Sequence, residues 1–201
     1  MGYPSFYNDV APIDLYDPLA DFLGAAEEGK ITIDYLDCVK LAGHSCPTVA
    51  GAYLMARVGL AALYPDTAPR RSEIRVELSG AEGEGVVGVV GNVIGYICGA
   101  GGIGGFKGIA GQFARNERLN YGVAFDGDVR LHRIDTDTSV TLRYDPSRVP
   151  GHPDMRTLMQ ASLTGEATPE ESRRFQSLWQ SRTQAILTAG NTTPFLTITQ
   201  G

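Results

Sequence analysis

The chain has few of the features that mark several large classes of protein. Its three Cys are an odd number, which cannot form a complete disulfide framework, and no apolar run approaches the roughly 20 residues that a membrane-spanning helix needs. Lys and Arg total 17 against 23 Asp and Glu, so the formal net charge is -6. We therefore expect a protein of the reducing cytoplasm, with neither nucleic acid nor a membrane as its main partner.

Several motifs of well-known enzymes are also missing. The sequence has no Gly-Lys-Ser/Thr of a phosphate-binding loop, no His-Glu-x-x-His and no nucleophile elbow. The first residues lack a basic stretch followed by an apolar one, so no secretory signal is expected. Residues 99–104 match Gly-x-Gly-x-x-Gly, but no series of strand–helix units surrounds them. A dinucleotide site is therefore not indicated.

The composition predicts one globular domain. The 201 residues are 43% hydrophobic and 20% charged, which is enough to build one core but not two. We assign residues 1–145 to an α+β core with an N-terminal extension. Residues 146–201 are assigned to a helical tail that packs on this core or on the partner of a homodimer.

The most informative stretch is Gly43-His44-Ser45-Cys46-Pro47-Thr48. Pro is favoured in the first turn of a helix, so Pro47 begins a helix with Cys46 as its N-cap, and Gly43 ends the helix before it. A sulfur at an N-cap faces free backbone N–H groups, which favour the thiolate. Thiolate and neutral imidazole are ligands of zinc and softer metals. The stretch predicts a metal or redox site at His44 and Cys46.

A simpler interpretation stays open for the same residues. A lone Cys is often a small buried hydrophobic residue, and a lone His is often packed or solvated. On this interpretation, Cys46 and His44 are structural and bind nothing.

A second element is marked by its glycines. They recur every three or four residues, which indicates a helix with glycines along one face and no side chains there. We expect this helix to begin near Asn92 and to pack against the Pro47 helix. These glycines are residues 85, 88, 91, 95 and 99. Cys98, at the end of this helix, is a candidate third metal ligand or else a packed thiol. Lys107, the only charge in the following glycine-rich stretch, is a candidate anion-binding group or a solvated side chain.

The remaining elements follow from shorter signals. Strands are expected over residues 74–78, 121–125, 129–134 and 140–144. The second and third of these form a hairpin around Asp126-Gly127, a favoured turn pair. Thr168-Pro169-Glu170-Glu171 is typical of a capping box and begins the tail helix. The apolar stripe of this helix, which includes Trp179, is assigned to core or dimer packing.

The Gly-His-x-Cys-Pro stretch and the glycine-rich region over residues 92–111 resemble the two motifs of the FmdE-like family, which is associated with formylmethanofuran dehydrogenase. The resemblance covers residues 30–145. It implies an α-β-α-β-β-β core with a mixed sheet, related to the catalytic domain of glyceraldehyde-3-phosphate dehydrogenase. It also implies a metal, commonly zinc, on the residues that correspond to His44 and Cys46.

The sequence departs from the family pattern at several places. Thr48 stands where the family has Gly. The acidic and Cys residues of the family's second motif are replaced here, and Gly91 and Asn92 stand in that neighbourhood. The tail has no Cys, so the zinc ribbon of some members is missing. These departures leave room for an open metal position that takes water, a substrate or a ligand from a partner.

Three hypotheses follow. The preferred one is a metal site at His44 and Cys46, with Cys98, Asn92, water or a partner residue as the third ligand, open to Lewis-acid or redox chemistry. The second is a haem site with Cys46 or His44 as axial ligand and the glycine-faced helix as a flat wall. The third is a structural or non-catalytic assembly subunit in which Cys46 is a packed residue. For a cofactor or small molecule, the candidate contacts are His44, Cys46, Asn92 and Lys107; whether the protein is an enzyme stays open.

Overall fold

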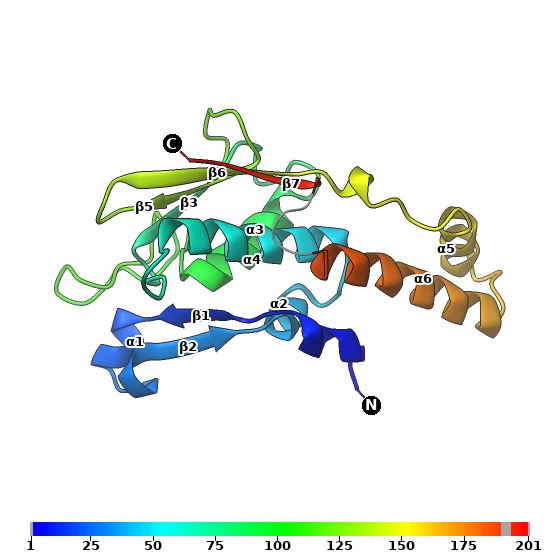
Figure 1. The fold of residues 1–201 in the computed structure, drawn as a ribbon, viewed down its shortest axis with the longest axis horizontal. Coiled ribbons are helices and arrows are strands. Elements are labelled where there is room, and N and C mark those ends of the chain that lie inside the picture. Colours follow the sequence, from blue (N-terminus) through cyan, green and yellow to red (C-terminus); the bar gives the residue numbers. More distant parts are fainter. Residues whose placement is uncertain (1, 190–193, 201) are drawn as a thin grey trace.

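The computed structural model describes residues 2–189 and 194–200, which form an α+β fold (Figure 1). A five-stranded sheet lies on one side of two long helices, α3 (Pro47–Leu63) and α4 (Val87–Cys98), and a two-stranded hairpin lies on the other. The sheet order is β4-β3-β5-β6-β7, with β3 and β4 parallel and the other pairs antiparallel. The strands are β3 (Ile74–Leu78), β4 (Leu119–Asn120), β5 (Val129–Arg133), β6 (Thr138–Tyr144) and β7 (Leu196–Gln200).

From α3 to β6 the elements follow the order α-β-α-β-β-β that the family resemblance implies, and the mixed sheet is confirmed. Within the described parts of the chain, no helix is both long and apolar enough to cross a membrane.

The two helices that flank the Gly-His-Ser-Cys-Pro stretch end and begin where the sequence predicts. Helix α2 (Tyr35–Ala42) ends at Gly43, whose φ of 76° lies in the left-handed region that favours glycine. Helix α3 begins with Pro47 in its first turn, and Cys46 is the N-cap. The Cys46 Sγ accepts a hydrogen bond of 3.5 Å from the Val49 N–H, which is one of the free donors of this helix start.

Helix α3 comes close to the sheet because it carries glycines on that side. A Cβ on Gly51 would stand 2.2 Å from the Tyr144 ring, and one on Gly59 would stand 2.7 Å from Leu131. Only hydrogen atoms fit at these two positions, so the backbone of α3 lies almost directly on the side chains of β5 and β6.

Helix α4 differs from its expected form in two respects. It begins at Val87 instead of near Asn92, so the glycine-spaced residues before Asn92 are helical too. It packs along α3, but its glycines admit other groups: a Cβ on Gly91 would stand 2.3 Å from the Tyr121 Oη, and one on Gly95 2.8 Å from the Ala100 carbonyl oxygen. The expected flat wall of glycine is wrong, because Tyr121 and the backbone at Ala100 cover it.

The expected hairpin around Asp126-Gly127 is also wrong. Strand β4 covers only Leu119–Asn120, and residues 121–125 run beside the end of β3, where the Val123 N–H donates to the Leu78 carbonyl at 3.0 Å. Strand β5 pairs with β3 on one edge and with β6 on the other. Since both edges of β5 are occupied, residues 121–125 have no edge to pair with.

The N-terminal residues form a hairpin that the sequence signals did not predict. Strands β1 (Ile13–Tyr16) and β2 (Lys30–Ile33) are antiparallel and enclose helix α1 (Pro18–Phe22). The Tyr53 hydroxyl on α3 donates to the carbonyls of Ala11 at 2.9 Å and Ile33 at 3.3 Å. This side chain therefore fastens the hairpin to the central helix. Three 3-10 turns complete the order: Ser5–Asp9, Glu27–Gly29 and Pro146–Arg148.

The tail contains helices α5 (Met155–Thr164) and α6 (Pro169–Leu187) before strand β7. The capping box at the start of α6 is confirmed, with reciprocal bonds between Thr168 and Glu171. Helix α6 packs against α3 near its own C-terminal end and against α5 near its start, where both extend away from the sheet (Figure 1). Because β7 pairs with β6, the segment assigned to a helical tail also contributes a strand to the sheet.

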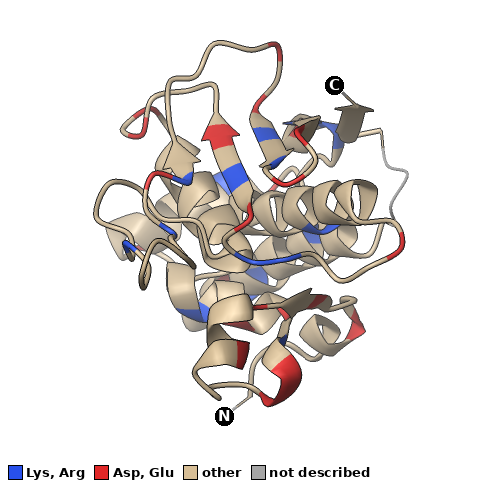
Figure 2. Cartoon of the chain, turned by 90° about the vertical axis from the view of Figure 1, so that its left-hand side faces the viewer, with Lys and Arg blue, Asp and Glu red and all other residues tan. Residues whose placement is uncertain are grey.

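Charged residues on the side shown in Figure 2 are of both signs, with Lys and Arg scattered among Asp and Glu. Many are paired locally. Arg130 on β5 contacts Glu77 on β3 at 2.5 Å, and Arg133 contacts Asp135 at 2.7 Å.

Candidate functional site

The backbone around Cys46 is held by side chains from three other elements. The Trp179 Nε1–H of α6 donates to the Ser45 carbonyl at 2.9 Å, and the Tyr144 hydroxyl at the end of β6 donates to the Pro47 carbonyl at 2.8 Å. The Ser45 Oγ shares a hydrogen bond of 2.9 Å with the buried Tyr35 hydroxyl of α2. The loop between α2 and α3 is thus fixed from several directions.

His44 and Cys46 lie on the wall of a common cavity. The His44 Nδ1 lies 2.9 Å from the Ala42 carbonyl, which can only accept, so Nδ1 carries the proton and Nε2 is the nitrogen that can offer a lone pair to a metal. The His44 side chain is exposed, while Cys46 is only 7% exposed. Both line a cavity of about 420 Å³, named here the His44–Cys46 cavity.

The tail helix α6 completes this cavity. Trp179 and Arg182 form part of its wall, together with Val86 and Val89 from the other side. The Arg182 guanidinium donates to the backbone carbonyls of Val149 at 2.7 Å and Pro146 at 2.8 Å. A cation is therefore fixed on the wall of the cavity that Cys46 also lines.

A second cavity of about 540 Å³ also has His44 on its wall and is named the His44–Arg115 cavity. One side is a face of α4 whose members recur at helical spacing: Val89, Asn92, Val93 and Tyr96. The opposite parts of the wall come from the end of α2 and from the glycine-rich stretch after α4. His44 and Val89 line both cavities, so the two spaces adjoin at these residues.

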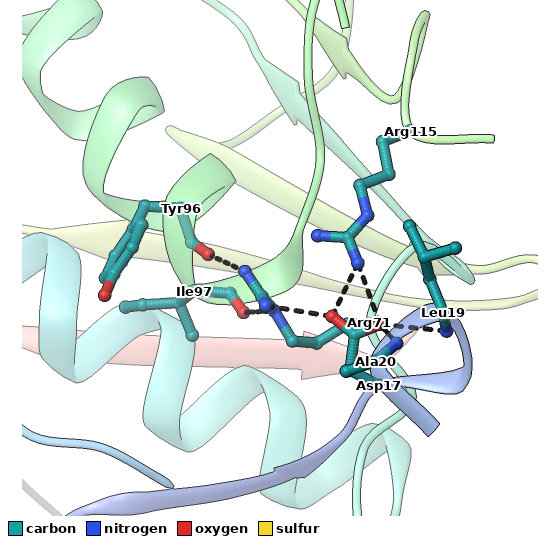
Figure 3. Close-up of polar contacts among 7 residues, drawn as sticks. All are labelled: Asp17, Leu19, Ala20, Arg71, Tyr96, Ile97 and Arg115. Atoms are coloured by element: carbon teal, nitrogen blue, oxygen red, sulfur yellow. Dashed lines mark hydrogen bonds and ion pairs between the residues drawn. The ribbon is translucent and has the colours of Figure 1, made fainter. Parts of the chain in front are cut away.

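Two arginines converge on one buried carboxylate at the edge of the second cavity (Figure 3). Asp17 is 1% exposed, and its oxygens contact Arg71 Nη1 at 2.9 Å and Arg115 Nη2 at 2.6 Å. Arg71 also donates to the carbonyls of Tyr96 at 2.7 Å and Ile97 at 3.1 Å. Its positive charge therefore lies at the C-terminal end of α4, where the helix dipole is negative.

The surroundings of Asp17 keep it ionised. Burial by itself would raise the pKa of this carboxyl, but the backbone N–H of Ala20 and the charges of Arg115 and Arg71 outweigh it and hold the pKa below its ordinary value. Burial lowers the pKa of the Arg71 guanidinium, against the opposing effect of Asp17. The cluster holds two cations and one anion.

The structure brings some of the proposed site residues together and not others. His44 and Cys46 share one cavity, and His44 and Asn92 share the other. Cys98 lines neither: it lies nine residues after Val89, which is about 13 Å along the helix. It is fully buried, and burial raises the pKa of its thiol to about 12. Lys107 is exposed and outside both walls.

The donor set fits an open metal site and not a closed one. Over residues 2–189 and 194–200, no three His, Cys, Asp or Glu side chains are grouped closely enough to hold a metal ion by themselves. A structural zinc site usually has four protein ligands, whereas His44 and Cys46 offer two. The remaining coordination positions of a metal would have to be filled by water, a small molecule or a residue of another chain.

Sequence reasoning missed the residues that complete the site from a distance. Trp179 was assigned to packing, although a Trp in a mostly polar helix is also a hydrogen-bond donor that needs a partner. No sequence motif linked Asp17, Arg71 and Arg115, because these residues come together only through the fold. The only signal was the Asp17-Pro18 pair, which is typical of a helix start.

The family model described as FmdE, molybdenum formylmethanofuran dehydrogenase operon, matches residues 41–195. This range includes the His44–Cys46 stretch, the whole of α4 and the tail helix α6. No curated protein matches the chain. Since the family model spans most of the 201 residues, the chain belongs to the FmdE family.

Proposed function

We propose that this protein binds one transition-metal ion, zinc in preference to others, through His44 Nε2 and Cys46 Sγ. The observation that carries the proposal is that His44 and Cys46 line one cavity, with Nδ1 of His44 bonded to the Ala42 carbonyl so that Nε2 is the nitrogen left for a metal. A hydrogen bond on the second ring nitrogen is the usual companion of a metal-binding His. Membership of the FmdE family, whose description names a molybdenum enzyme, supports the binding of a metal.

The remaining positions of the metal would be open to water, to a small molecule or to a residue of a second copy in a homodimer. A metal with such positions supplies Lewis-acid or redox chemistry when bound. The residues of this chain would hold the ligands in place, because Trp179 and Tyr144 fix the loop that carries both. We place this activity in the cytoplasm.

Elemental analysis of untagged protein tests the proposal. We expect about one zinc per chain in the unmodified protein, and its loss in His44→Ala and in Cys46→Ala. His152→Ala and Cys38→Ala are matched controls, because they remove the same side chains away from both cavities, and each should keep the metal. Circular dichroism would confirm that each variant is folded. Unchanged metal in a folded His44→Ala/Cys46→Ala variant would contradict the proposal.

Haem is a second candidate, because one observation favours it. His44 lies on the wall of a cavity of about 540 Å³ that also carries Arg71 and Arg115, and arginines pair with carboxylates such as the haem propionates. A Soret band that disappears in His44→Ala would support haem over zinc. A colourless protein with stoichiometric zinc would reject it.

A role in assembly without a metal is the third candidate. The metal and haem contents of the unmodified protein and of the His44→Ala/Cys46→Ala variant test it. If the double variant is folded and neither metal nor haem content changes, His44 and Cys46 hold neither group, which supports the assembly role. Light scattering would then give the mass of the particle and test the proposed homodimer.

A further inference from the structure

We propose that the His44–Arg115 cavity binds a small organic carboxylate, with Arg115 as the group that recognises the anion. This inference goes further than the proposed metal site, whose cavity shares the wall residues His44 and Val89 with this one. It rests on the charge of the Asp17 cluster, on the unpaired nitrogens of Arg115 and on the exposed face of α4.

The cluster of Asp17, Arg71 and Arg115 has a net positive charge. One carboxylate, on Asp17, faces two guanidinium groups, on Arg71 and Arg115. Arg71 uses all three of its nitrogens, since Nε and Nη2 donate to carbonyls of α4 and Nη1 to Asp17. Its charge also offsets the negative end of that helix. The positive charge of Arg115 is therefore the one left for a further anion.

Arg115 also has donors that no protein group uses. Its Nη2 contacts both oxygens of Asp17, but its Nε is buried without a hydrogen-bond partner among the described residues. No acceptor within the described ranges pairs with Nη1, which lies 3.4 Å from the place of a Cβ on the cavity residue Gly99. Figure 3 shows this nitrogen pointing away from Asp17. Nη1, unlike Nε, is not a buried atom, so an anion in the cavity can reach it and accept a charge-assisted hydrogen bond from it.

The rest of the wall suits an organic body. Helix α4 presents Val89, Val93 and Tyr96 to the cavity, and Phe106 lines it from the glycine-rich stretch. Asn92 lies on the same face of the helix and is exposed, and its side chain makes no hydrogen bond to the described residues. An apolar wall with a few polar groups that fix orientation is typical of small-molecule sites, and about 540 Å³ lies within their usual size.

The inference is tested with benzoate as the probe, on protein from which metal has been removed with a chelator. Saturation-transfer NMR titrations at fixed ionic strength would compare benzoate with benzamide, its uncharged counterpart. We expect benzoate to bind at least about tenfold more tightly, because only the carboxylate pairs with Arg115. Equal binding of the two would overturn the inference. So would displacement of benzoate by an equal concentration of inorganic phosphate, because the apolar wall would then contribute nothing.

Variants locate the binding. Arg115→Gln should weaken benzoate binding about tenfold or more, because it removes the charge that pairs with the carboxylate. Lys107→Gln removes the same charge outside the cavity and should leave binding unchanged. Asn92→Trp fills the cavity from an exposed helix position without touching the Asp17 cluster, and should abolish binding even if Arg115→Gln does not fold. Benzoate binding that survives Asn92→Trp would overturn the inference.

A last variant separates this inference from the metal proposal. Cys46→Ala lacks a proposed metal ligand but leaves every wall residue of the His44–Arg115 cavity in place, so its affinity for benzoate should stay close to that of the unmodified protein. Loss of benzoate binding in this folded variant would show that the anion is held at the metal ligands and not at Arg115. Failure of the metal proposal alone would leave the benzoate results unchanged.

Discussion

The indole N–H of Trp179 donates a hydrogen bond of 2.9 Å to the carbonyl of Ser45, across 134 residues of sequence. Ser45 lies between the two proposed metal ligands. An α6 side chain thus fixes the peptide that joins His44 to Cys46, and the same side chain lines the cavity that they face. The position of both ligands depends on the docking of the tail helix.

Trp179→Phe should loosen this peptide. The variant keeps most of the ring but removes the donor, so we expect the free energy of unfolding to fall by about 1 kcal/mol. We also expect a roughly tenfold loss of zinc affinity, as for other groups that orient metal ligands. Urea denaturation and a competition titration with a zinc chelator would measure the two. Gln176→Ala, at an exposed position of the same helix, should change neither.

Gly51→Ala should disturb the site from the opposite side of the loop. The added Cβ would stand 2.2 Å from the Tyr144 ring, so the ring must move away from the Pro47 carbonyl that its hydroxyl holds. We expect a loss of about 2 kcal/mol in unfolding free energy. Tyr144→Phe removes only the hydroxyl and should lose about 1 kcal/mol. An equal or smaller loss for Gly51→Ala would contradict this packing.

The three cysteines should differ in reactivity. Cys38 and Cys98 are fully buried, and burial raises the pKa of each thiol to about 12, so both stay protonated at neutral pH. Cys46 lines a cavity and is the one we expect to react with a thiol reagent in the native protein. Mass spectrometry after iodoacetamide treatment should show Cys46 alone modified without denaturant and all the cysteines modified with it. The Cys46→Ala variant should show no modified cysteine when it is treated without denaturant.

The stability of the Asp17 cluster should depend on pH in acid. Since the folded-state pKa of Asp17 is below the ordinary value of 3.8, the unfolded chain binds more protons in that range. The stabilisation is therefore present above pH 3.8 and is lost as pH falls through the folded-state pKa. Urea denaturation from neutral pH down into this acid range would follow the loss.

Asp17→Asn is the variant that isolates this effect. Asn keeps the cap on helix α1 but leaves two guanidinium groups without their carboxylate. We expect it to lower the unfolding free energy at neutral pH by about 3 kcal/mol. The difference from the unmodified protein should shrink below pH 3.8. A constant difference at all pH values would mean that Asp17 does not titrate as described.

Local chemistry made part of the fold predictable. Gly43 at a left-handed helix end, Pro47 in a first helical turn and the capping box at Thr168 each depend on a few neighbouring residues. The structure confirms all three. Family resemblance supplied the order of the core elements, which these local signals could not establish by themselves.

Elements that depend on distant partners were not predictable in the same way. Residues 121–125 have the composition of a strand, but β3 and β6 already occupy both edges of β5. Strand β7 exists because β6 offers a free edge, and the hairpin β1–β2 because Tyr53 and its neighbours fasten it to α3. The site shows the same division: His44 and Cys46 form a local motif, whereas Arg71 and Arg115 meet only through the fold.

The bond between Trp179 and Ser45 also has a consequence for the timing of synthesis. At about 5–20 residues per second, a ribosome needs on the order of ten seconds to add the residues that separate the two. Throughout that interval the nascent chain carries both proposed ligands without the α6 wall of their cavity. We expect metal capture to be a late event, completed only after α6 has left the exit tunnel and docked.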